Sequence, residues 1–372
     1  MTKLQRITLF FLLFGTMLIF GLIENIKGVS YPLIKAEFNA SWEQQGFMVS
    51  MLSLSYMGFS IVAGIFLGRF GIKPAVLSGF VVLILGLFSI FFMPGFFSTA
   101  AALFLVFAGF GFFDVGLNAL ASRIFTSKTA ILMNMLGAFY GIGAIIGPKI
   151  AGLLVNNAGI GWRYIYLLSL PLALVLFMSG IFTKFPEGKH SSSTVNEAGK
   201  TGGIVKRKSF FDALRSPLVW LFSLTLGLAI IIEMNSSNWG VLYFQDIYGM
   251  DPTTGGAAFL SVFFIVFTLS RLFCGAFVER IGYIRSLTGL AYIILFIFIT
   301  GFCLGARGIY ILPALGFFVA LLWPTIMALS VVRFGDDAPI MSSAIIAISG
   351  AVNAGAQYLV GLTNRFFGPA WG

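Results

Sequence analysis

The sequence is poor in charge, in acidic residues, in histidine and in cysteine. Charged residues make up 10% of the 372 residues and only 13 are acidic, whereas soluble domains carry roughly 25% charge. The single histidine, His190, leaves no basis for a His-rich metal centre. The two cysteines, Cys274 and Cys303, lie in apolar runs and are interpreted as packing residues. No nucleophile–base set or Gly-Lys phosphate loop is present, so the sequence predicts no enzyme, no metal and no cofactor.

What is abundant is apolar surface. Hydrophobic residues make up 59% of the chain, and the sequence contains 44 glycines and 43 phenylalanines. Glycine is frequent where membrane helices approach closely. Since a bilayer needs about 20 apolar residues per helix, the sequence predicts an all-α polytopic membrane protein. Eleven spans are expected near 7–32, 45–68, 74–94, 99–122, 130–156, 162–183, 217–244, 255–277, 286–305, 309–332 and 339–363.

One long polar segment divides these spans. It covers residues 185–215, includes Ser191 to Ser193 and Lys206 to Lys208, and predicts a flexible cytoplasmic linker. The expected parts are an N-terminal bundle, 1–184, with six spans and a C-terminal bundle, 216–372, with five.

The positive charges predict the orientation. With the N-terminus inside, the inside loops hold 16 of the 23 Lys and Arg residues and the outside loops hold four. This distribution predicts a cytoplasmic N-terminus in a bacterial plasma membrane. It also explains the net charge of +10 without a nucleic-acid partner, because the charges form no single stripe. The partners expected are the bilayer, a small solute and protons, and the chain is expected to be a monomer.

A loop pattern recurs in the two parts. The form G-x-x-x-[G/E]-R-x-G occurs after the second span and again after the eighth. Glycines permit tight turns, and internal repeats are common in secondary transporters. The alternative interpretation is that both loops are simply tight turns with inside-positive charge. The candidate gating residues are Gly64, Arg69 and Gly71 in the first copy, and Gly275, Glu279, Arg280 and Gly282 in the second.

These loops resemble the signature G-x-x-x-D-R-x-G-[RK]-[RK] of the major facilitator superfamily. The second copy carries Glu279 in place of the acid, and the first departs from the signature with Gly68. The resemblance implies two pseudo-symmetric six-helix bundles and alternating access. Because that family typically has twelve spans, the twelfth is expected to be missing here, unless the chain is a natural eleven-span form.

Ionisable residues within spans are expensive, about 2.5–3.5 kcal/mol each on insertion scales, and therefore mark candidate sites. Glu24 lies one turn from Lys27, so it is either a proton or substrate site or a local ion pair. Asp114 and Asn118 project from one helix face with no base within a turn. A role in proton coupling is favoured for Asp114 over a helix–helix anchor.

A third acid lies in a polar cluster of the seventh span. Glu233 is followed by Asn235 and Trp239, which fits the lining of a cavity, and Trp239 offers a flat ring for a sugar. The alternative is a broken helix whose side chains satisfy its own backbone. Lys149 either snorkels outward or makes a vestibule basic. Arg271 is expected to pair with a carboxylate or a helix end.

Several motifs together resemble the fucose–galactose–glucose:proton symporters. The matching positions are Gly21, Glu24, Gly28 and Pro32; Gly109, Gly111, Asp114 and Asn118; Asn134, Phe139, Gly143 and Ala144; Glu233 and Trp239; and Pro324 and Thr325. The resemblance implies that Glu24 and Asp114 take part in sugar binding and proton coupling and that Tyr140 contacts sugar. Glu24 replaces an aspartate of the family and Lys27 has no equivalent, which allows an anionic or otherwise different substrate.

The sequence thus predicts a secondary transporter, a proton-coupled symporter of a sugar or similar small polar metabolite. An exporter of drugs or hydrophobic metabolites is the alternative, since phenylalanine-rich cavities suit apolar cargo. Candidate proton-coupling residues are Asp114, Glu24 and Glu233. Candidate substrate-binding residues are Glu24, Asn25, Asn118, Tyr140, Glu233, Asn235, Trp239, Trp323, Asn353 and Gln357.

Overall fold

The computed structural model describes residues 3–124, 129–186, 210–273 and 275–370, which form helices and no strand. Eleven helical stretches in these ranges are long and apolar enough to cross a bilayer. The predicted all-α polytopic fold is therefore confirmed. The spans are α1 (Lys3–Glu37), α2 (Trp42–Phe70), α3 (Ile72–Phe92), α4 (Phe96–Ile124), α5 (Thr129–Ala158), α6 with α7 (Trp162–Leu168, Leu170–Phe182), α9 (Pro217–Asn238), η2 with α11 (Pro252–Gly256, Ala257–Phe273), α13 (Tyr283–Cys303), a tenth described below, and α16 (Ala338–Phe367).

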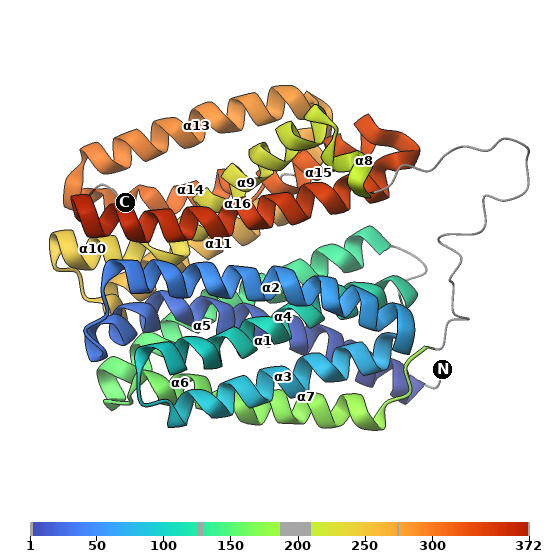
Figure 1. The fold of residues 1–372 in the computed structure, drawn as a ribbon, viewed down its shortest axis with the longest axis horizontal. Coiled ribbons are helices and arrows are strands. Elements are labelled where there is room, and N and C mark those ends of the chain that lie inside the picture. The colour runs from blue at the N-terminus through green and yellow to red at the C-terminus, as the bar shows by residue number, and fades with distance from the viewer. Residues whose placement is uncertain (1–2, 125–128, 187–209, 274, 371–372) are drawn as a thin grey trace, which may run out of the picture.

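The helices form two bundles that lie side by side (Figure 1). Helices α1 to α7 make one bundle, and α8 (Phe210–Leu214) to α16 make the other. We call the end where α1 begins and α7 stops the linker end, and the opposite end the Glu37 end. Most of the predicted linker, residues 187–209, lies outside the described residues.

Two predicted spans differ in detail from the helices observed. The seventh was expected to run to residue 244, but α9 stops at Asn238 and the chain turns at Trp239 into α10 (Gly240–Tyr248). The tenth begins at Gly305, which has φ +59°, and is broken at Ile311 and again at Ala320 and Leu321. Pro313 lies in the short turn that follows the first break. The pieces of this span are η3 (Gly305–Tyr310), η4 (Leu312–Ala314), α14 (Leu315–Val319) and α15 (Leu322–Phe334).

The repeated loops have the same backbone in both bundles. Gly71 joins α2 to α3 with φ +89°, and Gly282 joins α12 (Gly275–Ile281) to α13 with φ +94°. These angles lie in a region that is essentially open to glycine alone. Beyond the first loop, the Lys73 ammonium donates to the Ile181 and Thr183 carbonyls, at 2.6 and 2.9 Å. A cation at this helix end complements the dipole of α7.

Glycines set how closely the helices of one bundle pack. A Cβ on Gly21 would lie 2.0 Å from the Tyr140 carbonyl oxygen, and one on Gly143 would lie 2.1 Å from that of Leu18. In lipid, such small residues let two backbones meet. The contact between α1 and α5 therefore depends on these glycines, and it fixes the height of Tyr140 relative to α1.

The two bundles meet at the Glu37 end and near mid-span. Lys35 of α1 pairs with Asp246 of α10 at 3.6 Å, and Glu43 of α2 pairs with Arg365 of α16. At mid-span, Asn353 donates to the Ser53 hydroxyl at 3.4 Å. These contacts between the bundles all lie at the Glu37 end or at mid-span. The structure is thus closed at the Glu37 end.

Candidate substrate and proton site

Glu24 is held between its own helix and α5. The Tyr140 hydroxyl donates to Glu24 Oε2 at 2.7 Å, while Glu24 Oε1 lies 3.5 Å from the Lys27 ammonium. The Glu24 side chain is 13% exposed and that of Lys27 is 4% exposed. Next to them, Asn25 is buried and donates to the Gly21 carbonyl at 2.9 Å. The predicted residues Glu24, Asn25 and Tyr140 are therefore in one place.

Asp114 forms a second group on α4. Asn118 donates to the Asp114 carbonyl at 2.6 Å and to its carboxylate at 3.3 Å. The Tyr56 hydroxyl of α2 lies within hydrogen-bonding reach of the same carboxylate. A Cβ on Gly111 would meet the Tyr56 carbonyl oxygen at 2.6 Å, so glycine again lets the two helices close.

Phe20 links the two groups. Its ring lies 5.4 Å from that of Tyr140, edge to face, and 6.4 Å from that of Tyr56. It also stacks on Phe110 at 4.4 Å. Contacts in this range suit aromatic pairs. Glu24 and Asp114 are also close enough to interact electrostatically. Sequence reasoning missed Tyr56 and Phe20, because neither residue differs from the many other aromatic residues in these spans.

Glu233 faces this set from the other bundle. The Glu233 carboxylate lies within electrostatic range of Glu24, Lys27 and Arg271. Arg271 of α11 is exposed, and its guanidinium lies 4.4 Å from the centre of the Phe267 ring. The expected pairing of Arg271 with a carboxylate or a helix end stays a prediction, with Glu233 within electrostatic range. Glu24 thus lies within electrostatic range of both other predicted intramembrane acids, Asp114 and Glu233.

The remaining polar residues form an amide cluster in the second bundle. Gln357 of α16 accepts from the Trp239 indole N–H at 2.7 Å and from Asn238 at 3.2 Å. Its amide nitrogen donates to Asn235 at 2.9 Å and to Asn353 at 3.1 Å. Gln357 is fully buried and Trp239 is 5% exposed. The predicted residues Asn235, Trp239, Asn353 and Gln357 thus lie together. Gln357 is hydrogen-bonded to each of the other three.

The environment of Trp239 limits how it could act. Its ring lies 6.2 Å from that of Trp42, on the first bundle, at an angle of 32°. One ring face and the N–H group are thus occupied in this closed arrangement. Stacking of Trp239 on a sugar stays a prediction, and on the face that Trp42 covers it requires Trp42 to move away.

Trp323 and the loop residues lie apart from the acids. Trp323, on α15, is 40% exposed, and among the described residues no hydrogen bond or ring contact joins it to the acids. Lys149 is likewise exposed, on α5. Arg69, Glu279 and Arg280 are exposed at the linker end. A gating role for these loops stays a prediction. In the described ranges, no group of three or more His, Cys, Asp or Glu side chains is placed to hold a metal.

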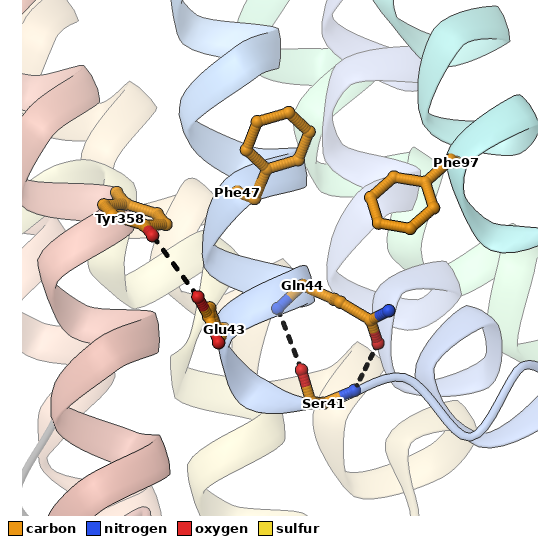
Figure 2. A pocket seen from close by; sticks show the side chains of 6 residues that line it. All are labelled: Ser41, Glu43, Gln44, Phe47, Phe97 and Tyr358. Atoms are coloured by element: carbon orange, nitrogen blue, oxygen red, sulfur yellow. Dashed lines mark hydrogen bonds between the residues drawn. The ribbon is translucent and has the colours of Figure 1, made fainter.

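Two hollows lie near the Glu37 end. One, of about 460 Å³, lies between the starts of α2 and α4, and Tyr358 of α16 reaches Glu43 across it (Figure 2). The Ser41 and Gln44 side chains cap α2 there. The other hollow, of about 320 Å³, is lined mainly by aromatic side chains of the second bundle, with Asn235, Ser236 and Asn364 as its polar members. Its aromatic lining is Trp42, Trp239, Tyr243, Phe244, Phe259, Phe298 and Phe302.

Solved structures share this fold. A bacterial homologue of the human lysosomal transporter Spinster, inward-facing and unoccupied, aligns with a TM-score of 0.74 at 17% identity, covering 99% of this chain and 84% of that one. The nucleoside transporter NupG gives 0.74 at 12% identity over 98% and 92%. The transporter FucP in its outward conformation gives 0.63 at 17% identity over 98% and 95%. At such identities, the likeness shows the fold.

Curated relatives match over shorter stretches. The multidrug efflux pump SdrM of Staphylococcus aureus is 26% identical over 57% of this chain and 47% of its own length. The probable actinorhodin transporter of Streptomyces coelicolor is 30% identical over 32% and 22%. The matched stretch spans less than half the length of each. The profile of the Major Facilitator Superfamily, in contrast, matches residues 12–363. With its eleven spans, its two bundles and this match along its length, the chain belongs to the major facilitator superfamily of transporters.

Proposed function

We propose that the protein is a proton-coupled symporter of a sugar or similar small polar metabolite. The observation that carries the proposal is the group formed by Glu24, Asp114 and Glu233 between the bundles. Each carboxylate is costly within a membrane, and each lies beside hydroxyl, amide or basic partners that would suit a polar solute. A proton that binds this group changes its charge, and therefore changes its affinity for a solute.

The site would be reached from the linker end in this arrangement. Exposure increases along α4 from Asp114 to Asn118, toward the linker end, while the Glu37 end is closed by ion pairs and backbone contacts. Alternating access would open the Glu37 end and close the other. With the predicted orientation, the linker end faces the cytoplasm of a bacterial cell, and a monomer would suffice for transport.

Uptake into proteoliposomes tests the proposal. Uptake of a sugar or polar metabolite is expected to increase at least tenfold when an inward proton gradient is imposed. Asp114→Asn is expected to reduce that increase, because Asp114 lies close enough to Glu24 to interact with it electrostatically, while Asp251→Asn, outside the spans, is expected to keep it. Equal uptake by wild type and Asp114→Asn under the gradient would show that Asp114 does not couple protons.

A second candidate function is export of hydrophobic compounds. The aromatic hollow of about 320 Å³ favours it, since it offers apolar walls and few polar groups. Relatives described as a multidrug efflux pump and an actinorhodin transporter point the same way. Thermal stabilisation of the purified protein by hydrophobic dyes, with none by sugars, organic acids or nucleosides, would favour the exporter over the symporter.

A further inference from the structure

Lys27 is a buried cation in the middle of the protein. Its side chain is 4% exposed, on α1 between the two bundles. A lysine at such a depth is costly to retain, and such residues commonly mark the path of an ion or substrate. The symport mechanism proposed above does not assign a role to Lys27.

The partners of Lys27 are few and distant. The ammonium lies 3.5 Å from Glu24 Oε1, 3.9 Å from the Met234 sulfur and 5.7 Å from the centre of the Phe107 ring. An ammonium has three N–H donors, and a charge-assisted hydrogen bond is typically about 2.7–2.9 Å long. Glu24 is the one carboxylate within salt-bridge distance among the described residues. The ammonium thus has donors to spare for an anion.

Glu24 is held more firmly by another residue. Its second oxygen accepts the Tyr140 hydroxyl at 2.7 Å, a shorter contact than the one to Lys27. A proton on Glu24 would keep the Tyr140 hydrogen bond possible, but it would remove the negative charge beside Lys27. Protonation of Glu24 would therefore leave a buried ammonium without an ionised carboxylate at salt-bridge distance among the described residues.

The other charged groups near Lys27 determine the net charge of the site. Glu24 on α1 and Glu233 on α9 lie within electrostatic range of Lys27. Asp114 on α4 is in turn within range of Glu24, and Arg271 on α11 is within range of Glu233. With every acid ionised, three negative charges stand against two positive ones. One proton on Glu24 makes the group neutral, and a bound monoanion then restores the original charge.

The place of Lys27 fits a head-group site. It lies one turn beyond Glu24 toward the Glu37 end, and there the bundles are in contact: a Cβ on the adjacent Gly28 would lie 1.9 Å from a Leu260 methyl carbon. The ammonium thus lies on the closed side of Glu24. The Tyr140 hydroxyl, the Asp114 carboxylate and the Asn118 amide lie on the other side of Glu24 and suit the hydroxyls of a solute.

We infer that the substrate is a hydroxylated monocarboxylate of the sugar-acid type, whose carboxylate replaces Glu24 beside Lys27 when Glu24 carries the coupled proton. The inference rests on the proposed symport and names its substrate class. One proton and one monoanion cross together, so the cycle moves no net charge. A neutral sugar with one proton would move one positive charge and would respond to the membrane potential.

The experiment compares acids with matched neutral sugars. The full chain in proteoliposomes is given glucuronate or gluconate and, as neutral partners, glucose. An inward proton gradient is expected to drive uptake of an acid at least tenfold above that of glucose. A potassium diffusion potential, negative inside and without a pH gradient, is expected to change that uptake less than twofold.

Variants at Lys27 test whether this residue binds the carboxylate of the substrate. Lys27→Met is expected to lower acid uptake at least tenfold, and Lys27→Arg to retain most of it. Lys149→Met, a lysine on the exposed face of α5, is expected to stay within twofold of wild type. Glu24→Gln is expected to bind the acid with an affinity that no longer depends on pH, as measured by thermal stabilisation.

The outcomes separate this inference from the proposed function. Proton-driven uptake of glucose that Lys27→Met does not affect would overturn the inference and leave the symport intact. A lack of proton-driven uptake of any polar solute would overturn the symport itself. If Lys27→Met does not fold, the wild-type comparison decides: stabilisation by glucose and by none of the acids contradicts the inference.

Discussion

Gly46 of α2 and Gly361 of α16 meet backbone to backbone between the two bundles. A Cβ on Gly46 would lie 2.8 Å from the Gly361 Cα, and a Cβ on Gly361 would lie 2.7 Å from the Gly46 Cα. The Glu43–Arg365 ion pair lies one turn away. Exposed ion pairs contribute little, about 0–1 kcal/mol, so the glycine contact is the stronger determinant of closure at the Glu37 end.

Gly46→Ala is therefore expected to prevent full closure at that end. The protein should favour the arrangement open at the Glu37 end, and transport should fall at least tenfold. With Lys35→Cys as reporter in a Cys274→Ser, Cys303→Ser background, labelling by an impermeant maleimide should increase several-fold.

The same helices supply the controls. Gly58 on α2 and Gly355 on α16 have open space where a Cβ would be built. Gly58→Ala and Gly355→Ala are expected to transport and label like wild type. Unchanged labelling in Gly46→Ala would mean that the bundles close without this contact.

The two repeated loops are expected to be equally sensitive to a side chain. Gly71→Ala and Gly282→Ala each place a Cβ at a positive φ that only glycine adopts readily. Each should lower the free energy of unfolding by about 1–3 kcal/mol, measured as a lower Tm in detergent. Gly64→Ala and Gly68→Ala, on the same α2, meet open space and are expected to change Tm little. If only one of Gly71→Ala and Gly282→Ala lowered Tm, the two loops would not be equivalent.

A cap at the Glu37 end is expected to make stability depend on pH. Asp251 accepts from the Thr253 hydroxyl at 2.5 Å and from the backbone N–H groups of Thr253 and Thr254 at 2.7 and 3.0 Å. Chiefly the Thr253 hydroxyl, and then the backbone donors, hold the pKa of Asp251 below its ordinary value. A lowered pKa adds stability above the unfolded value, and this stability is lost as the pH falls through the folded value.

Asp251→Ala should therefore lower the free energy of unfolding by about 1 kcal/mol at neutral pH. That deficit should shrink as the pH falls below about 4. Asp251→Asn, which can still cap the helix, should lose less. Thermal unfolding of the three proteins across this pH range measures the effect, and a deficit that stays constant with pH would exclude the carboxylate as its source.

The sequence predicted the spans because their signal is local. Apolar runs of about 20 residues need no knowledge of neighbours, and the helices of the structure end within a few residues of the predicted limits except at Trp239. The glycine loops were found for a similar reason. A turn that needs positive φ requires glycine in the sequence itself, as at Gly71 and Gly282.

The partners of the site residues could not be found in this way. Trp239 and Gln357 are 118 residues apart, and Glu43 and Arg365 are 322 apart. A span that is apolar on all sides gives no pattern that says which face meets which helix. The acids were found because charge is rare in spans, whereas Tyr56 and Phe20 were missed because aromatic residues are common there.

Tyr140 tests whether the group around Glu24 acts in transport. Tyr140→Phe removes the 2.7 Å hydrogen bond to Glu24 and leaves the ring against Phe20. A hydrogen bond to a charged group is worth about 1.5–3 kcal/mol, so proton-driven uptake should fall by about tenfold or more. Tyr164→Phe, half-exposed on α6 against Phe91, removes a hydroxyl far from the acids and should leave uptake unchanged. If Tyr140→Phe took up substrate like wild type, the hydrogen bond between Tyr140 and Glu24 would have no part in transport.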